Sequence, residues 1–139
     1  DPAFLRLEIT ESVLMESYDL IDQQIEALRA IGVKMALDDF GKGYSSLSYL
    51  KVLPLDTLKI DKSFIDHIPE NSKDSFLTSQ IIAIGKNLDL QVVAEGVETI
   101  DQLEYLRKHN CDRFQGYYYS PSIPAAKALA LLKESNPLT

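Results

Sequence analysis

Acidic side chains recur in this sequence at or just after the end of short apolar runs. Four of them close successive runs: Glu8, Asp38, Asp61 and Glu95. Carboxylates brought onto one small surface repel one another unless they are protonated or neutralised by cations. Their hard oxygen atoms suit Mg²⁺, Mn²⁺ or Ca²⁺ rather than a thiol-seeking metal. If the fold brings the runs together, this pattern predicts a divalent-metal site.

Lys59 lies two residues before Asp61, inside the third apolar run. Side chains two residues apart on a strand point to the same face, so the ammonium and the carboxylate should share one space. A lysine that faces the interior of a barrel needs a charged partner. A carboxylate–metal cluster or a ligand phosphate would supply that partner, which places Lys59 in the predicted site.

Acids after strands also have a purely structural explanation, because a negative charge at the start of a helix stabilises the helix. For Asp39 or Glu98 taken singly, helix capping explains the sequence as well as a site does. A single acid at the end of each of four runs is better explained by a metal site.

The elements that must position these residues follow from the hydrophobic period, which switches between short extended runs and longer helical ones. Strands are expected at residues 4–9, 33–37, 57–60, 91–94 and 112–114. Helices are expected at residues 18–30, 46–50, 72–87, 100–109 and 125–134. This alternation predicts an α/β fold with a parallel sheet, in which all the strands end at one edge.

Composition and charge exclude several classes of function. The net charge is −7 over 139 residues, which argues against a protein that grips the backbone of DNA or RNA. The single cysteine, Cys111, excludes an internal disulfide framework and fits a reducing cytoplasm. No apolar run reaches eighteen residues, so we expect no membrane contact by this chain.

Five short motifs together resemble those of the EAL domain, in the order and at the spacings of that family. They are LEITES at 7–12, DDFGKGYSS at 38–46, LKID at 58–61, AEGVET at 94–99 and QGY at 115–117. The resemblance covers nearly the whole chain. It implies a TIM-like (β/α) barrel that hydrolyses cyclic-di-GMP to 5′-pGpG with two divalent cations, Mg²⁺ or Mn²⁺. Ca²⁺ is expected to bind without supporting turnover.

The resemblance also implies roles for individual residues. The implied metal ligands are Glu8, Asp38, Asp39, Asp61 and Glu95. Lys59 would hold the nucleophilic water or a phosphate oxygen, Glu95 would also act as the base, and Gln115 would position the water and the phosphate. The loop at 39–46 resembles a mobile loop that couples dimerisation to activity. The residues implied in that coupling are Glu11, Gly41, Ser45 and Glu98.

Two parts of the family pattern have no equivalent in these 139 residues: the Glu-x-Leu motif near the start of the full domain, and the metal-binding Asn on the strand before Glu8. A complete β/α barrel takes roughly 250 residues. We therefore interpret residues 1–139 as the C-terminal portion of one EAL domain, about half of a barrel, and predict that the chain alone is inactive. It is expected to pair with a second copy or with the missing half, and the parent protein could be anchored in a membrane.

Lys42 is a smaller departure, since it stands where the family often has a small polar residue. Its side chain could contact a phosphate, but we expect Lys42 to be solvated.

Two other functions stay open at this point. One is a degenerate EAL domain that binds cyclic-di-GMP without hydrolysing it, although the acids and Lys59 argue against decay in this part of the domain. The other is an enolase-like barrel, which also places carboxylates and a lysine on successive strands, but the motifs at 38–43 and 95–98 fit it poorly.

Overall fold

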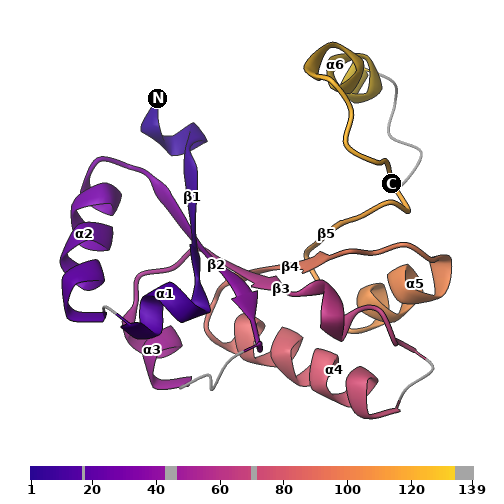
Figure 1. The fold of residues 1–139 in the computed structure, drawn as a ribbon, viewed down its shortest axis with the longest axis horizontal. Helices are drawn as coiled ribbons and strands as arrows, with labels where there is room; N and C mark the ends of the chain where they lie inside the picture. Colours follow the sequence, from indigo (N-terminus) through magenta and orange to yellow (C-terminus); the bar gives the residue numbers. More distant parts are fainter. Residues whose placement is uncertain (17, 43–46, 70–71, 134–139) are drawn as a thin grey trace.

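The computed structural model describes residues 1–16, 18–42, 47–69 and 72–133 (Figure 1). Its centre is a five-stranded parallel sheet in which each strand pairs with its neighbours in sequence. The strands are β1 (Arg6–Thr10), β2 (Lys34–Phe40), β3 (Thr57–Ile60), β4 (Gln91–Glu95) and β5 (Arg113–Gln115). β1 and β5 are consequently the two edges of the sheet.

A helix or helical turn follows each strand along the chain. The α-helices are α1 (Glu11–Glu16), α2 (Tyr18–Ala30), α3 (Leu47–Val52), α4 (Ser72–Asn87), α5 (Ile100–Lys108) and α6 (Ala125–Lys133). Two 3₁₀ turns, η1 (Pro2–Phe4) and η2 (Lys62–Phe64), complete the described elements. Parallel strands that alternate with helices confirm the predicted α/β class, and the arrangement is that of part of a β/α barrel.

Most element bounds agree with the expectations from sequence, and the differences lie near the polar residues. The ranges 18–30, 57–60 and 72–87 are reproduced to the residue. Phe4 was expected in the first strand but belongs to η1, because Pro2 suits the first turn of a helix. β2 continues past the predicted Leu37 to Phe40 and so includes two aspartates. The short helix α1 was not predicted.

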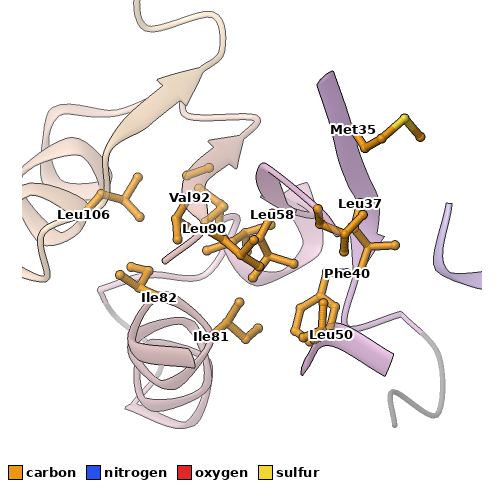
Figure 2. Close-up of a cluster of buried hydrophobic side chains, with 14 of the residues drawn as sticks. Met35, Leu37, Phe40, Leu50, Leu58, Ile81, Ile82, Leu90, Val92 and Leu106 are labelled. Atoms are coloured by element: carbon orange, nitrogen blue, oxygen red, sulfur yellow. The ribbon is translucent and has the colours of Figure 1, made fainter. Parts of the chain in front are cut away.

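The core lies between the sheet and the helices. Leu58 and Val92 are fully buried and point toward α4, which contributes Ile81 and Ile82 (Figure 2). Gly85 lets α4 approach this face, because a Cβ there would lie 2.5 Å from a methyl group of Val92. With one face of each strand committed to this core, the other face is left for the polar residues.

The end of the chain departs from the compact part. After β5 the chain forms a turn at residues 117–119 and then continues without regular structure to α6, which stands away from the sheet (Figure 1). None of the α6 residues is buried, although the helix contains four alanines and three leucines. In the described residues no helix is long and apolar enough to cross a membrane.

Candidate functional site

The polar face of the sheet follows from the two-residue period of its strands. On β3, Leu58 points to the helices, so its neighbour Lys59 points to the opposite face. Glu8 on β1, Asp38 on β2 and Glu95 on β4 lie at the same face, near the carboxyl ends of their strands. The parallel register sets these ends beside one another, and this brings together side chains far apart in sequence.

Three carboxylates converge on the ammonium of Lys59. Its Nζ lies 2.7 Å from Glu8 Oε2, 2.8 Å from Glu95 Oε1 and 3.1 Å from Asp38 Oδ1. Only 10% of the lysine side chain is exposed. The cluster therefore gathers three negative charges around one positive charge, and its members come from four strands.

The charge state of Lys59 follows from this environment. Burial on its own would lower the pKa of the ammonium. Hydrogen bonds to Glu8, Glu95 and Asp38 outweigh that effect and raise the pKa above the usual value for lysine. Lys59 is therefore a fixed cation and a hydrogen-bond donor at neutral pH, not a proton acceptor.

A second lysine sits between the other two predicted ligands. Lys42 Nζ lies 2.8 Å from Asp39 Oδ1 and 2.9 Å from Asp61 Oδ2. The other oxygen of Asp61 accepts hydrogen bonds from the backbone N–H and the hydroxyl of Ser63, at 3.0 and 2.6 Å. Burial would raise the pKa of Asp61, but the bonds from Ser63 and Lys42 lower it to about 2.

The position of Asp39 depends on an irregularity in β2. Successive residues of a regular strand point to opposite faces, so Asp38 and Asp39 would normally diverge. The register with β3 shifts between Leu37 and Phe40, and Asp39 takes a positive φ of 57°. Aspartate tolerates this left-handed conformation better than most residues. Both carboxylates thereby reach the same end of the sheet, and the Asp39 N–H donates to Asp38 Oδ1 at 2.9 Å.

The loop that begins at Asp39 is held from two sides. Glu11, buried at the start of α1, accepts a hydrogen bond from the Gly41 N–H at 3.1 Å. Gly41 has a φ of 100°, and a Cβ there would lie 2.6 Å from the ring of Phe64. Any larger residue would therefore push the loop away from η2. Ser45, predicted to belong to this loop, lies outside the described residues.

Glu98 and Gln115 lie at the same end of the sheet, near the carboxyl ends of β4 and β5, but outside the two lysine-centred clusters. Glu98 forms an ion pair with Lys62, whose side chain also covers Gly96. Gln115 ends β5 and pairs in register with Glu95 on β4. Its backbone carbonyl accepts a hydrogen bond from the Val97 N–H at 3.1 Å.

The oxygen atoms at this end of the sheet suit a divalent cation as ligands, because five carboxylates at or just after the ends of four strands meet there. In the part of the chain that the structure describes, however, no three Asp, Glu, His or Cys side chains form a group that could hold a metal ion. The reason is visible in the contacts, since an ammonium group takes the central position of each cluster. Lys59 and Lys42 thus occupy the positions to which the carboxylates attract a cation. A metal ion could be coordinated there only if further ligands were added or a lysine ammonium moved away.

Sequence reasoning missed the contribution of Lys42, which was expected to be solvated. It is half exposed, yet it bridges two of the predicted ligands. The spacing of Asp39 and Lys42, three residues apart in a turn that contains glycine, is the one signal in the sequence that could have indicated the pair.

Comparison with known proteins identifies a family that this chain matches in sequence. The model of the EAL domain matches residues 1–122. The cyclic di-GMP phosphodiesterase NbdA of Pseudomonas aeruginosa is 50% identical over 123 residues, which are 88% of this chain and 16% of NbdA. The chain thus spans about a sixth of that relative's length.

Solved structures give the same result for the fold. The phosphodiesterase MucR of Pseudomonas aeruginosa, in complex with cyclic-di-GMP, has a TM-score of 0.87 and 45% identity, over 91% of this chain and 51% of that one. BlrP1 of Klebsiella pneumoniae, in complex with manganese and cyclic-di-GMP, has a TM-score of 0.81 and 32% identity, over 86% of this chain and 31% of that one.

Proposed function

This chain belongs to the EAL domain family, and we propose that it forms the C-terminal portion of a domain that hydrolyses cyclic-di-GMP to 5′-pGpG. The observation that carries the proposal is the convergence of Glu8, Asp38 and Glu95 on Lys59, beside Asp39 and Asp61, at the carboxyl ends of parallel strands. In β/α barrels this end of the sheet is where catalysis takes place. Relatives named as cyclic-di-GMP phosphodiesterases support the choice of substrate.

The proposed cofactors are two divalent cations, Mg²⁺ or Mn²⁺, with Ca²⁺ binding but not supporting turnover. The manganese complex of BlrP1 supports this choice. Such ions, when bound, generate a nucleophile at neutral pH and neutralise charge on the phosphoryl group. The residues proposed to hold them are Glu8, Asp38, Asp39, Asp61 and Glu95.

The proposed roles of the remaining groups follow from their chemistry. Lys59 carries an ammonium group, so it can donate hydrogen bonds to a phosphate oxygen or to the attacking water. Glu95, next to Lys59, is the proposed acceptor of the water's proton. Gln115, in register with Glu95, would orient the water and the phosphate. Attack of water on phosphorus breaks one P–O3′ bond, and the 3′ oxygen leaves with a proton.

The proposed active unit is larger than this chain. The strands that carry the Glu-x-Leu glutamate and the Asn in the family pattern have no equivalent in these 139 residues; the triplet Glu26-Ala27-Leu28 lies in the helix α2. Among the described residues, the edges β1 and β5 have no further strand beside them. We infer that the missing part of the domain, or a second copy, completes the site. Glu11 and Gly41, with Ser45 and Glu98, would then couple that assembly to the site through the loop that starts at Asp39.

The test is turnover by the complete gene product that contains this sequence. In Mn²⁺ or Mg²⁺ it should convert cyclic-di-GMP to 5′-pGpG, and Glu95→Gln should lower kcat by about a hundredfold or more because the proton acceptor is lost. Glu104→Gln removes one carboxylate at an exposed site on α5 and should leave kcat unchanged. Binding of cyclic-di-GMP without turnover by the unaltered protein would instead favour a receptor.

A further inference from the structure

Lys42 carries a positive charge for which the proposed reaction has no use. Its Nζ contacts Asp39 Oδ1 at 2.8 Å and Asp61 Oδ2 at 2.9 Å. Its backbone N–H also donates to the carbonyl oxygen of Asp39 at 3.3 Å. The turn from residue 39 to residue 42 is thus closed twice, through the backbone and through the side chain, and the side chain lies over two proposed metal ligands.

The contacts of Asp61 limit how a metal ion could bind to it. Ser63 takes up Oδ1 with its N–H and its hydroxyl, so Oδ2 is the oxygen left for a cation. Lys42 contacts that oxygen. The Asp61 side chain is only 10% exposed, which limits the access of water to it. A divalent ion that uses Asp61 would therefore meet Lys42 at the same atom.

The two site lysines differ in how easily they can leave. Lys59 is 10% exposed and is held by carboxylates from three strands. Lys42 is 52% exposed and stands on a loop. A lysine with a solvated stem can move its ammonium into water at little cost. Lys42 is therefore the displaceable cation of the two.

We propose that Lys42 is a built-in competitor of the divalent cation at Asp39 and Asp61, and that its ammonium must move into solvent before a metal binds there. A higher metal concentration is then needed to occupy this position than the carboxylates alone would require. The inference rests on the proposed function, because it takes Asp39 and Asp61 as metal ligands.

The strength of the ion pairs sets how far Lys42 weakens the apparent affinity for the metal. A state that blocks the ligands weakens the apparent metal affinity by the factor by which that state is favoured. Two ion pairs to a half-exposed lysine correspond to a factor of roughly two to thirty. Removing the ammonium should tighten metal binding by that factor, because Asp39 and Asp61 are then left without a cation in the metal-free protein.

The experiment is a calorimetric titration of the complete gene product with Mn²⁺ in the absence of nucleotide. Lys42→Gln should lower the dissociation constant of the affected site by about two- to thirtyfold. It should also increase the rise in melting temperature that saturating Mn²⁺ produces. Lys42→Arg keeps the charge and should bind Mn²⁺ as the unaltered protein does.

The matched control is Lys34→Gln. Lys34 pairs with Asp56 at 2.9 Å and is 49% exposed, so the charge change is the same and the exposure is close to the 52% of Lys42. Lys34 stands at the opposite end of β2. Tighter Mn²⁺ binding in Lys42→Gln alone supports the proposal. Equal binding in all variants, or equal tightening in Lys34→Gln, overturns it and leaves the proposed function intact. No Mn²⁺ binding by any variant overturns both.

Discussion

Lys59 brings a single positive charge to the place where carboxylates from three other strands meet. With a tenth of its side chain exposed, its attraction to them is screened less than that of a surface ion pair. Without it, Glu8, Asp38 and Glu95 would repel one another across the end of the sheet. The lysine therefore stabilises the strand ends of the metal-free protein as well as serving the proposed reaction.

Lys59→Met should lower the free energy of unfolding of the complete gene product by about 2–4 kcal/mol in the presence of EDTA, because removing one partner leaves charges unpaired. Saturating Mn²⁺ should restore part of that loss, since it neutralises the same carboxylates. Urea denaturation with and without metal measures both effects.

The control for this substitution is Lys108→Met, which removes an exposed lysine from the last turn of α5 and should change stability by less than about 0.5 kcal/mol. If Lys59→Met in EDTA unfolds at the same urea concentration as the unaltered protein, Lys59 does not hold the strand ends together.

For individual residues, the sequence predicts only those side-chain positions that follow from a regular backbone. The face of the sheet to which Lys59 points follows from the two-residue period of a strand, so its place among the acids was expected. The pairing of Lys42 depends on the positive φ values of Asp39 and Gly41. A hydrophobic pattern contains no information on such angles, and Lys42 was therefore expected in solvent.

Among the elements, two aspartates fix the amino ends of neighbouring strands in the same way. Asp56, directly before β3, accepts hydrogen bonds from the Met35 N–H on β2 and from Lys34 Nζ, both at 2.9 Å. Asp112, directly before β5, accepts from the Val92 N–H on β4 at 2.8 Å. Each aspartate thus ties the start of one strand to the strand before it, opposite the proposed site.

The pKa of Asp56 reflects this contact. Burial would raise it, but the bonds from the Met35 N–H and from Lys34 bring it below the ordinary value of 3.8. Asp56→Asn should therefore cost about 1–2 kcal/mol at neutral pH. A lowered pKa contributes stability that is complete above 3.8 and is lost as the pH falls below it, so the difference between the two proteins should shrink below about pH 4.

Chemical denaturation at a series of pH values checks this prediction, with Asp101→Asn in the first turn of α5 as an exposed control. A difference between Asp56→Asn and the unaltered protein that stays constant down to pH 3 would contradict the proposed charge contribution.

Sequence reasoning located well those elements whose hydrophobic pattern runs over many residues or whose boundary residues are distinctive. Thr99 and Gln102 form a capping box, and α5 begins at Ile100, as predicted. α1 has six residues, too few for a helical period to be recognised, and β2 was ended early because its last residues are acidic. The bulge in β2 explains how those acids remain in the strand.

On the scale of the whole molecule, the described residues form one five-stranded sheet whose edges, β1 and β5, have no further strand beside them, and α6 lies apart from the sheet (Figure 1). Open edges expose unpaired backbone groups that invite further strands. The chain also covers only 51% of the similar MucR structure. Both observations are consistent with a partial barrel. That other residues complete the barrel stays a prediction.

If that interpretation is correct, the 139-residue chain alone should show no conversion of cyclic-di-GMP to 5′-pGpG in Mn²⁺, whereas the complete gene product should. Circular dichroism would show in parallel whether the isolated chain is folded. Turnover by the isolated chain at a rate similar to that of the complete protein would show that these residues hold every indispensable group.

We propose that the carboxyl ends of β1 to β4 hold the catalytic metals. The decisive measurement is anomalous X-ray diffraction from crystals of the complete gene product soaked in Mn²⁺. We expect a pair of peaks within about 2.5 Å of carboxylate oxygens of Glu8, Asp38, Asp39, Asp61 and Glu95. Manganese bound elsewhere, with Lys59 and Lys42 still paired to these carboxylates, would show that the proposed metal site is wrong.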